Sequence, residues 1–214
     1  MSELGQQEME PTGMVGGLDD KSKKTLADWL GDMVALESHI EEALDRQLGQ
    51  VKDDAIAVEA VRSFHDTVKR QRDALKALQE QYGGTAGSPI KEAGAALLGK
   101  AASIIDMMRA EGNSKALRDD YTAFNLAAIG YTMLHTTATA LGDARLAGVA
   151  EQHLRGYAGM IQRINHIIED VVVNELAKDD HKVAAGAADA TRKMADAAWK
   201  ATAQDSSSSG TMRA

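Results

Sequence analysis

The chain has 214 residues and no cysteine, which excludes disulfides, thiolate catalysis and metal sites built on cysteine. Proline occurs only at Pro11 and Pro89, so almost nothing interrupts a long helix. Aromatic residues make up only 4% of the chain, and no segment shows the alternating pattern of a strand. Apolar residues instead recur at helical spacing, which predicts an all-α protein.

Basic residues are also in short supply, with 24 Lys and Arg against 32 Asp and Glu, for a net charge of −8. Phosphate binding needs clustered cations, so this balance argues against a nucleic-acid partner. No apolar run reaches the roughly 18–20 residues of a membrane span. Residues 1–17 lack the apolar stretch of an export signal. We therefore expect a cytoplasmic protein with no membrane partner.

The remaining pattern divides the chain into helices. We expect residues 1–17 and 205–214 to be disordered, since their composition builds no core. Residues 18–178 should form one helical domain, and 179–204 an accessory segment. Helices are predicted over 19–48, 54–82, 114–141, 143–177 and 180–203, with a shorter one from Ser88-Pro89 to about 112. Ser114 is the expected N-cap of the helix that follows it.

The loops between these helices predict their arrangement. A short loop joins the first two long helices into an antiparallel hairpin, and another joins the helices over 114–141 and 143–177. A long connection, carrying the short helix, lies between the hairpins. Two hairpins joined by a crossover are typical of the ferritin-like four-helix bundle. A C-terminal helix would be added to it.

Glu37 is the residue that most suggests a site. It falls on the apolar stripe of the first helix, between Met33 and Ile40, where side chains face the core. A lone buried carboxylate is costly, so such a group is normally paired, protonated or bound to a metal.

Two segments carry a family resemblance. LADWLGDMVALESHIEEAL, over 26–44, resembles the first helix of the YciE/YciF-type ferritin-like family of bacterial stress-associated proteins. LGDARLAGVAEQHLRGYAGMIQRINHIIEDVVVNELA, over 141–177, is similar to the last bundle helix of that family. The resemblance covers about 19–177. It implies a stress-associated four-helix bundle able to carry two metal ions, and a homodimer.

The resemblance also implies which positions would hold metal. Glu37 matches the ligand of the first helix, and the second-helix ligand falls near Asp66. The other two helices should offer carboxylates and histidine, but the matching positions hold other residues: Phe124, Asn125, Ala127, Gly156 and Tyr157. These replacements predict a degenerate di-metal centre, most simply with no cofactor.

Two hypotheses about Glu37 follow. In the first, it is protonated or hydrogen-bonded to Tyr157, Asn125 or His65. In the second, a substitute metal site forms. Glu37 and His65 lie equally far from the loop of their hairpin, so they should share a layer. His153, one turn from Tyr157, would complete a set for Zn²⁺ or Fe²⁺.

Three functions therefore remain open. The first is a structural or stress-associated bundle with a degenerate centre. The second is a protein that binds iron, manganese or zinc through Glu37, His65 or Asp66, and His153. The third is an acidic desiccation or scaffold protein with no site, in which Glu37 would face solvent. No nucleophile with a base, phosphate loop or dinucleotide fingerprint appears, which favours a protein that is not an enzyme.

Overall fold

The computed structural model describes residues 17–82 and 112–209. This part contains helices and no strand: α1 (Asp20–Leu48), α2 (Ala55–Gln81), α4 (Asn113–Leu141), α5 (Ala144–Lys178) and α6 (Ala187–Ser209). The all-α prediction is confirmed. The helix predicted from Ser88-Pro89 lies outside the described residues, as do residues 1–16.

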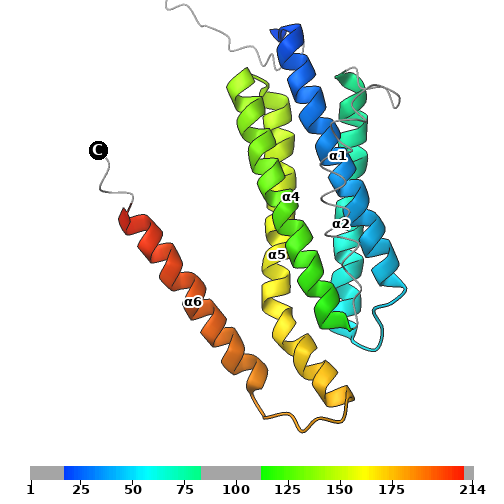
Figure 1. The fold of residues 1–214 in the computed structure, drawn as a ribbon, viewed down its shortest axis with the longest axis vertical. Coiled ribbons are helices and arrows are strands. Elements are labelled where there is room, and N and C mark those ends of the chain that lie inside the picture. Colours follow the sequence, from blue (N-terminus) through cyan, green and yellow to red (C-terminus); the bar gives the residue numbers. More distant parts are fainter. Residues whose placement is uncertain (1–16, 83–111, 210–214) are drawn as a thin grey trace, which may run out of the picture.

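The first four of these helices form a bundle of two hairpins (Figure 1). α1 packs on α2 and α4 packs on α5, while α1 also contacts α4 and α2 contacts α5. Each of these neighbouring pairs runs antiparallel. α2 ends at the opposite end of the bundle from the start of α4. The four-helix arrangement expected from the loop lengths is therefore present.

Aspartates begin three of the helices. The carboxylates of Asp19, Asp54 and Asp143 accept hydrogen bonds from backbone N–H groups in the first turns of α1, α2 and α5. Ser114 was expected to cap α4, and this was wrong. Gly112 is the N-cap residue, and Glu175 of α5 accepts from the Ser114 backbone N–H at 2.9 Å. A side chain from a neighbouring helix thus replaces the local cap.

α6 differs from its prediction at both ends. It begins at Ala187 rather than near 180, because Asp180 and Gly186 adopt positive φ angles of 58° and 76° in the preceding connection. It continues to Ser209, into the segment 205–214 that was expected to be unstructured. It packs against α5 and then diverges from the bundle (Figure 1).

The middle of the core contains a group of aromatic side chains. Both phenylalanines meet there, Phe64 edge-on to Phe124 with ring centroids 5.2 Å apart. Tyr157 packs on Phe124 at 5.7 Å and on Tyr131 at 5.7 Å. Four of the eight aromatic side chains of this sequence therefore lie together in this layer, where Tyr131 contacts Glu37 directly.

Candidate functional site

Glu37 lies at the centre of the bundle and is fully buried. The Tyr131 hydroxyl of α4 donates a hydrogen bond to its Oε1. His153 of α5 places Nδ1 3.0 Å from the Tyr131 oxygen and 3.8 Å from Glu37 Oε1. Because the Tyr131 proton goes to Glu37, His153 Nδ1–H is the donor to the Tyr131 oxygen. Three helices thus contribute to one chain of polar groups.

Tyr157 completes what we call the Glu37 cluster: Glu37, Tyr131, His153 and Tyr157. It is fully buried one helical turn after His153, with its ring stacked on Tyr131. Its hydroxyl lies close enough to Glu37 to influence the carboxyl pKa. Yet neither this hydroxyl nor Glu37 Oε2 has a hydrogen-bond partner of ordinary geometry among the described residues. The two groups are nevertheless coupled, because each shifts the pKa of the other.

Burial sets the protonation of this cluster. It raises the pKa of Glu37 to about 8, although Tyr131, Tyr157 and the charge of Arg72 act in the opposite direction. Burial lowers the pKa of His153 to about 4. The pKa of both tyrosines is raised, again mainly by burial. At neutral pH the metal-free cluster consequently holds protonated Glu37 and neutral His153, without an ion pair.

His65 does not join this cluster, so the predicted pairing with Glu37 is wrong. Its Nε2 lies 3.8 Å from Glu41 Oε1 and 3.8 Å from Asp45 Oδ1. The reason is helical phase. Phe64 faces the core, and the next residue is turned by about 100°, toward the edge between α1 and α2. There it meets Glu41, one turn beyond Glu37.

Asp66 lies still farther from the centre. Its side chain is 59% exposed, and its Oδ1 is 3.6 Å from Nδ1 of His65. Of the four predicted ligands, the structure brings Glu37 and His153 together and leaves His65 and Asp66 near the surface. No group of three or more His, Asp or Glu side chains arranged to hold a metal occurs in the described part of the chain.

Tyr131 is the member of the cluster that sequence reasoning missed. Asn125 was considered as a partner of Glu37, but it is exposed and donates to the Tyr121 carbonyl at 2.7 Å. The sequence could have indicated this role, because Tyr131 lies on the apolar stripe of α4 that faces the core. A buried tyrosine needs a partner for its hydroxyl, and a buried acid is the natural one.

The positions expected to hold a di-metal centre do not fit one. Phe124 and Ala127 are fully buried and offer no ligand atoms. At Gly156, a Cβ would lie 2.4 Å from the Gln71 amide nitrogen, which donates to the His153 carbonyl at 3.2 Å. The space that carboxylates and histidines would need for two ions is filled by rings and an amide.

A family model described as a domain of unknown function, DUF892, matches residues 21–178. The chain belongs to this family. The match spans α1 to α5 and leaves out α6. No curated protein matches the chain.

One solved structure supports the fold of this DUF892 chain. It is a crystal structure of a protein from Xanthomonas campestris pv. campestris, similar at 18% identity with a TM-score of 0.60. The similarity covers 75% of this chain and 99% of the other. At this identity the likeness concerns the bundle alone.

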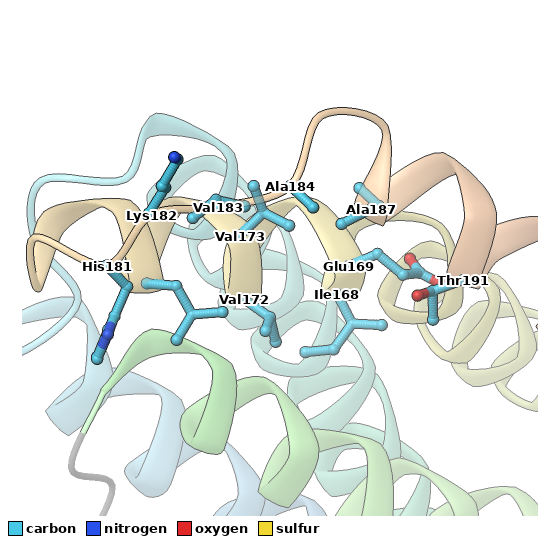
Figure 2. Close-up of a pocket in the computed structure, with 12 residues that line it drawn as sticks. Ile168, Glu169, Val172, Val173, His181, Lys182, Val183, Ala184, Ala187 and Thr191 are labelled. Atoms are coloured by element: carbon cyan, nitrogen blue, oxygen red, sulfur yellow. The ribbon is translucent and has the colours of Figure 1, made fainter.

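The DUF892 bundle has a hollow that is separate from the Glu37 cluster (Figure 2). It has a volume of about 500 Å³ and lies between the end of α5, the connection after it and the start of α6. Its lining is largely apolar, with Ile168, Val172 and Val183 among the contributors. It offers no set of converging catalytic groups. None of the described helices combines the length and apolar character needed to cross a membrane.

Proposed function

We propose that this protein is a ferritin-like bundle of the YciE/YciF type, with a structural or stress-associated role in the bacterial cytoplasm. A hydrogen-bonded cluster replaces the di-metal centre. The observation that carries this proposal is the hydrogen bond from Tyr131 to buried Glu37. It holds α1 and α4 together at the point where other ferritin-like bundles place metal ligands.

The alternative of a desiccation or scaffold protein without a site loses its support. That hypothesis required Glu37 to face solvent, and the burial of Glu37 contradicts it. The metal-binding alternative keeps one specific observation in its favour. His153 Nδ1 and Glu37 Oε1, two potential ligand atoms from different helices, lie 3.8 Å apart.

The structural role is tested by Tyr131→Phe. Removing the hydroxyl leaves Glu37 Oε1 without a partner in a dry core, which should lower the free energy of unfolding by roughly 1–3 kcal/mol. Tyr121→Phe is the matched control on the same helix, since Tyr121 is only half-buried and lies outside the cluster. It should change stability by less than about 0.5 kcal/mol. Equal effects of the two substitutions in urea denaturation would contradict the proposal.

We also propose that the protein is a homodimer formed through the outer face of α4. From Tyr121 to Leu141 this helix contains no Asp, Glu, Lys or Arg, in a chain that is 26% charged. Exposed surfaces of bundle helices normally carry such charges. Leu126, Ile129 and Met133 instead form an exposed stripe at helical spacing, with 37, 55 and 46% of their surface accessible.

The threonines of this face add to its apolar character. The hydroxyls of Thr122, Thr132, Thr136 and Thr137 donate to carbonyls of the preceding helical turn at 2.9–3.2 Å. Their hydrogen-bonding capacity is thus partly used within the helix, which lowers the cost of removing them from water. A second copy of α4, equally uncharged and running antiparallel about a two-fold axis, suits this surface.

A further inference from the structure

The hollow between α5, the connection after it and α6, called here the α5–α6 hollow, has the size of a small-molecule site. Its volume of about 500 Å³ falls within the range of roughly 300–1,000 Å³ found for ligand pockets. Ile168 and Val172 of α5 line it together with Val183 and Ala184 of the connection (Figure 2). A ligand that removes these walls from water must therefore have an apolar body.

Much of the α5–α6 hollow lies outside the family domain. The DUF892 match ends at residue 178, whereas the second wall comes from residues 181–191. This wall exists because α6 packs against α5 after the connection. The hollow is therefore a feature of the segment that follows the matched domain, and it is independent of the Glu37 cluster and of the function proposed above.

Glu169 of α5 is the polar group that indicates a ligand. Its residue surface is only 7% exposed, yet it lines the hollow. Figure 2 shows Glu169 and Thr191 at the same end of the hollow, with His181 and Lys182 at the other end. Glu169 Oε2 has no hydrogen-bond partner among the described residues. Buried polar atoms normally have one, so a donor on a bound ligand would explain this exception.

Arg192 does not satisfy Glu169. Its Nε lies 3.9 Å from Glu169 Oε2, which is beyond hydrogen-bond distance. Its two terminal nitrogens instead donate to Asp170 at 2.6 Å and to Asp189 at 3.0 Å. Three carboxylates thus surround one guanidinium, and this end of the hollow carries an excess of negative charge. Charge complementarity favours a cationic ligand here.

The composition of the lining selects the kind of cation. Glu169 is the single acidic residue among the described residues that line the hollow, whereas a metal ion needs several ligand atoms. A quaternary ammonium has no N–H to donate to Oε2. A protonated primary amine carries both the positive charge and three N–H donors, as the lysine side chain does. Attached to an apolar body, it matches both parts of the hollow.

We propose that the α5–α6 hollow binds a small amphipathic primary amine. The ammonium group donates to the Glu169 carboxylate, and the apolar body packs against Ile168, Val172 and Val183. Binding is non-covalent and requires no other reactant. A ligand held in this way contacts both walls, so it also holds α6 against α5.

Calorimetric titration of the full-length protein at about pH 7 tests this proposal. Phenylbutylamine is the probe, since an alkyl amine with a pKa of about 10.4 is protonated under these conditions. Phenylbutanol and phenylbutyrate have the same apolar body with a neutral or a negative head. We expect one amine to bind per chain, about tenfold more tightly than the alcohol, because its hydrogen bond to Glu169 is charge-assisted. The carboxylate should bind most weakly, because Glu169 repels it.

Glu169→Gln removes the negative charge while keeping the shape of the side chain. It should weaken phenylbutylamine binding by about tenfold and leave phenylbutanol binding unchanged. Glu151→Gln is the matched control on the same helix, because Glu151 is exposed, pairs with Arg155 and does not line the hollow. It should leave the affinities for both probes unchanged.

A second pair of variants tests the location of the site. Ala184→Phe places a ring in the hollow and should abolish binding of both the amine and the alcohol. Ala185→Phe is the control, since Ala185 is the exposed next residue and does not line the hollow. Both alanines precede the first residue of α6, so neither change alters the helix itself. Circular dichroism would verify that both variants keep their helix content.

Several outcomes would overturn the inference. These are no binding of phenylbutylamine, equal affinities for the three head groups, an affinity unaffected by Glu169→Gln, or binding that persists in Ala184→Phe. A change in the molecular mass measured by light scattering when the amine is added would identify a second copy of the chain as the occupant, and would also contradict the proposal. The effect of Tyr131→Phe on stability is measured without any amine, so either proposal can fail while the other stands.

Discussion

At the scale of single residues, Glu37 shows how burial changes the chemistry of a carboxyl group. Its position on the apolar stripe predicted burial, and burial is confirmed. The identity of its partner depended on how α4 packs against α1, because Tyr131 is far from Glu37 in sequence. The predicted pairing with His65 also failed on tertiary geometry. A shift of one residue turns a helical side chain by about 100°, which is enough to move it from the core to the edge of the hairpin.

The pKa values predict how the stability of the metal-free protein depends on pH. The folded pKa of Glu37, about 8, exceeds its ordinary value of 4.5, so its contribution to stability falls as pH rises between these values. For His153 the folded pKa of about 4 lies below 6.5, so its contribution rises with pH over that range. The pKa of buried Asp120, raised to about 7, acts like that of Glu37.

Above pH 7 the Glu37 term is the largest of the three, because His153 is already neutral and Asp120 is more than half ionised. We therefore expect the free energy of unfolding to fall by up to about 1.4 kcal/mol per pH unit between pH 7 and 8, which urea denaturation would measure. Glu37→Gln should flatten this slope, whereas Asp120→Asn should preserve it. A slope unchanged by Glu37→Gln would show that Glu37 is already ionised in the folded protein.

Gly156 permits a close approach that a larger residue would prevent. In a helix, Gly→Ala normally stabilises by up to about 1 kcal/mol. Gly159→Ala should show this gain, because no atom lies within 4 Å of its added methyl group. Gly156→Ala should gain less or destabilise, since its methyl group would displace the Gln71 amide from the His153 carbonyl. Thermal denaturation of the two variants compares them directly, and equal gains would contradict this account.

At the scale of helices, the sequence was enough to predict a helix start where the capping residue directly precedes the helix. Asp54 and Asp143 could be recognised from sequence because the groups they accept from lie two or three residues away. The start of α4 could not, because Glu175 reaches it from a different helix. The start of α6 was misplaced because alanine-rich sequence continues smoothly through a connection whose turns depend on Asp180 and Gly186.

Arg192 attaches α6 to the bundle. Its guanidinium lies 2.6 Å from Asp170 Oδ2 and 3.9 Å from Glu169 Oε2, both on α5. Arg192→Ala should weaken this attachment by about 1 kcal/mol and speed amide hydrogen exchange in α6, while exchange in α1 and α2 stays unchanged. Lys193→Ala, at the exposed neighbouring position, is the control. Unchanged exchange in α6 would show that apolar contacts alone hold it.

At the scale of the whole molecule, loop lengths and helical periodicity were enough to predict a bundle of two hairpins. They were not enough to predict what fills its centre. The resemblance supplied ligand positions, but the actual cluster depends on how the hairpins pack against each other. Which side chains meet across that interface is set by tertiary register, which a single sequence encodes only indirectly.

The proposed dimer makes a prediction at this scale. Ile129→Lys places a charge in the middle of the uncharged α4 face, and burying it in a dimer would be costly. We expect light scattering to show dimers for the unaltered chain and monomers for this variant. Met194→Lys changes an exposed apolar residue on α6 and should leave the dimer intact. A monomeric unaltered chain would disprove the dimer.

The division of the Glu37 cluster between hairpins has a consequence for assembly. Glu37 belongs to the α1–α2 hairpin, whereas Tyr131, His153 and Tyr157 all belong to the α4–α5 hairpin. In a separate first hairpin Glu37 would meet water and ionise. Joining the two halves at neutral pH must then take up a proton, with Glu37 as its acceptor. If the two hairpins are prepared as separate fragments and mixed in a weakly buffered solution, their association should raise the pH.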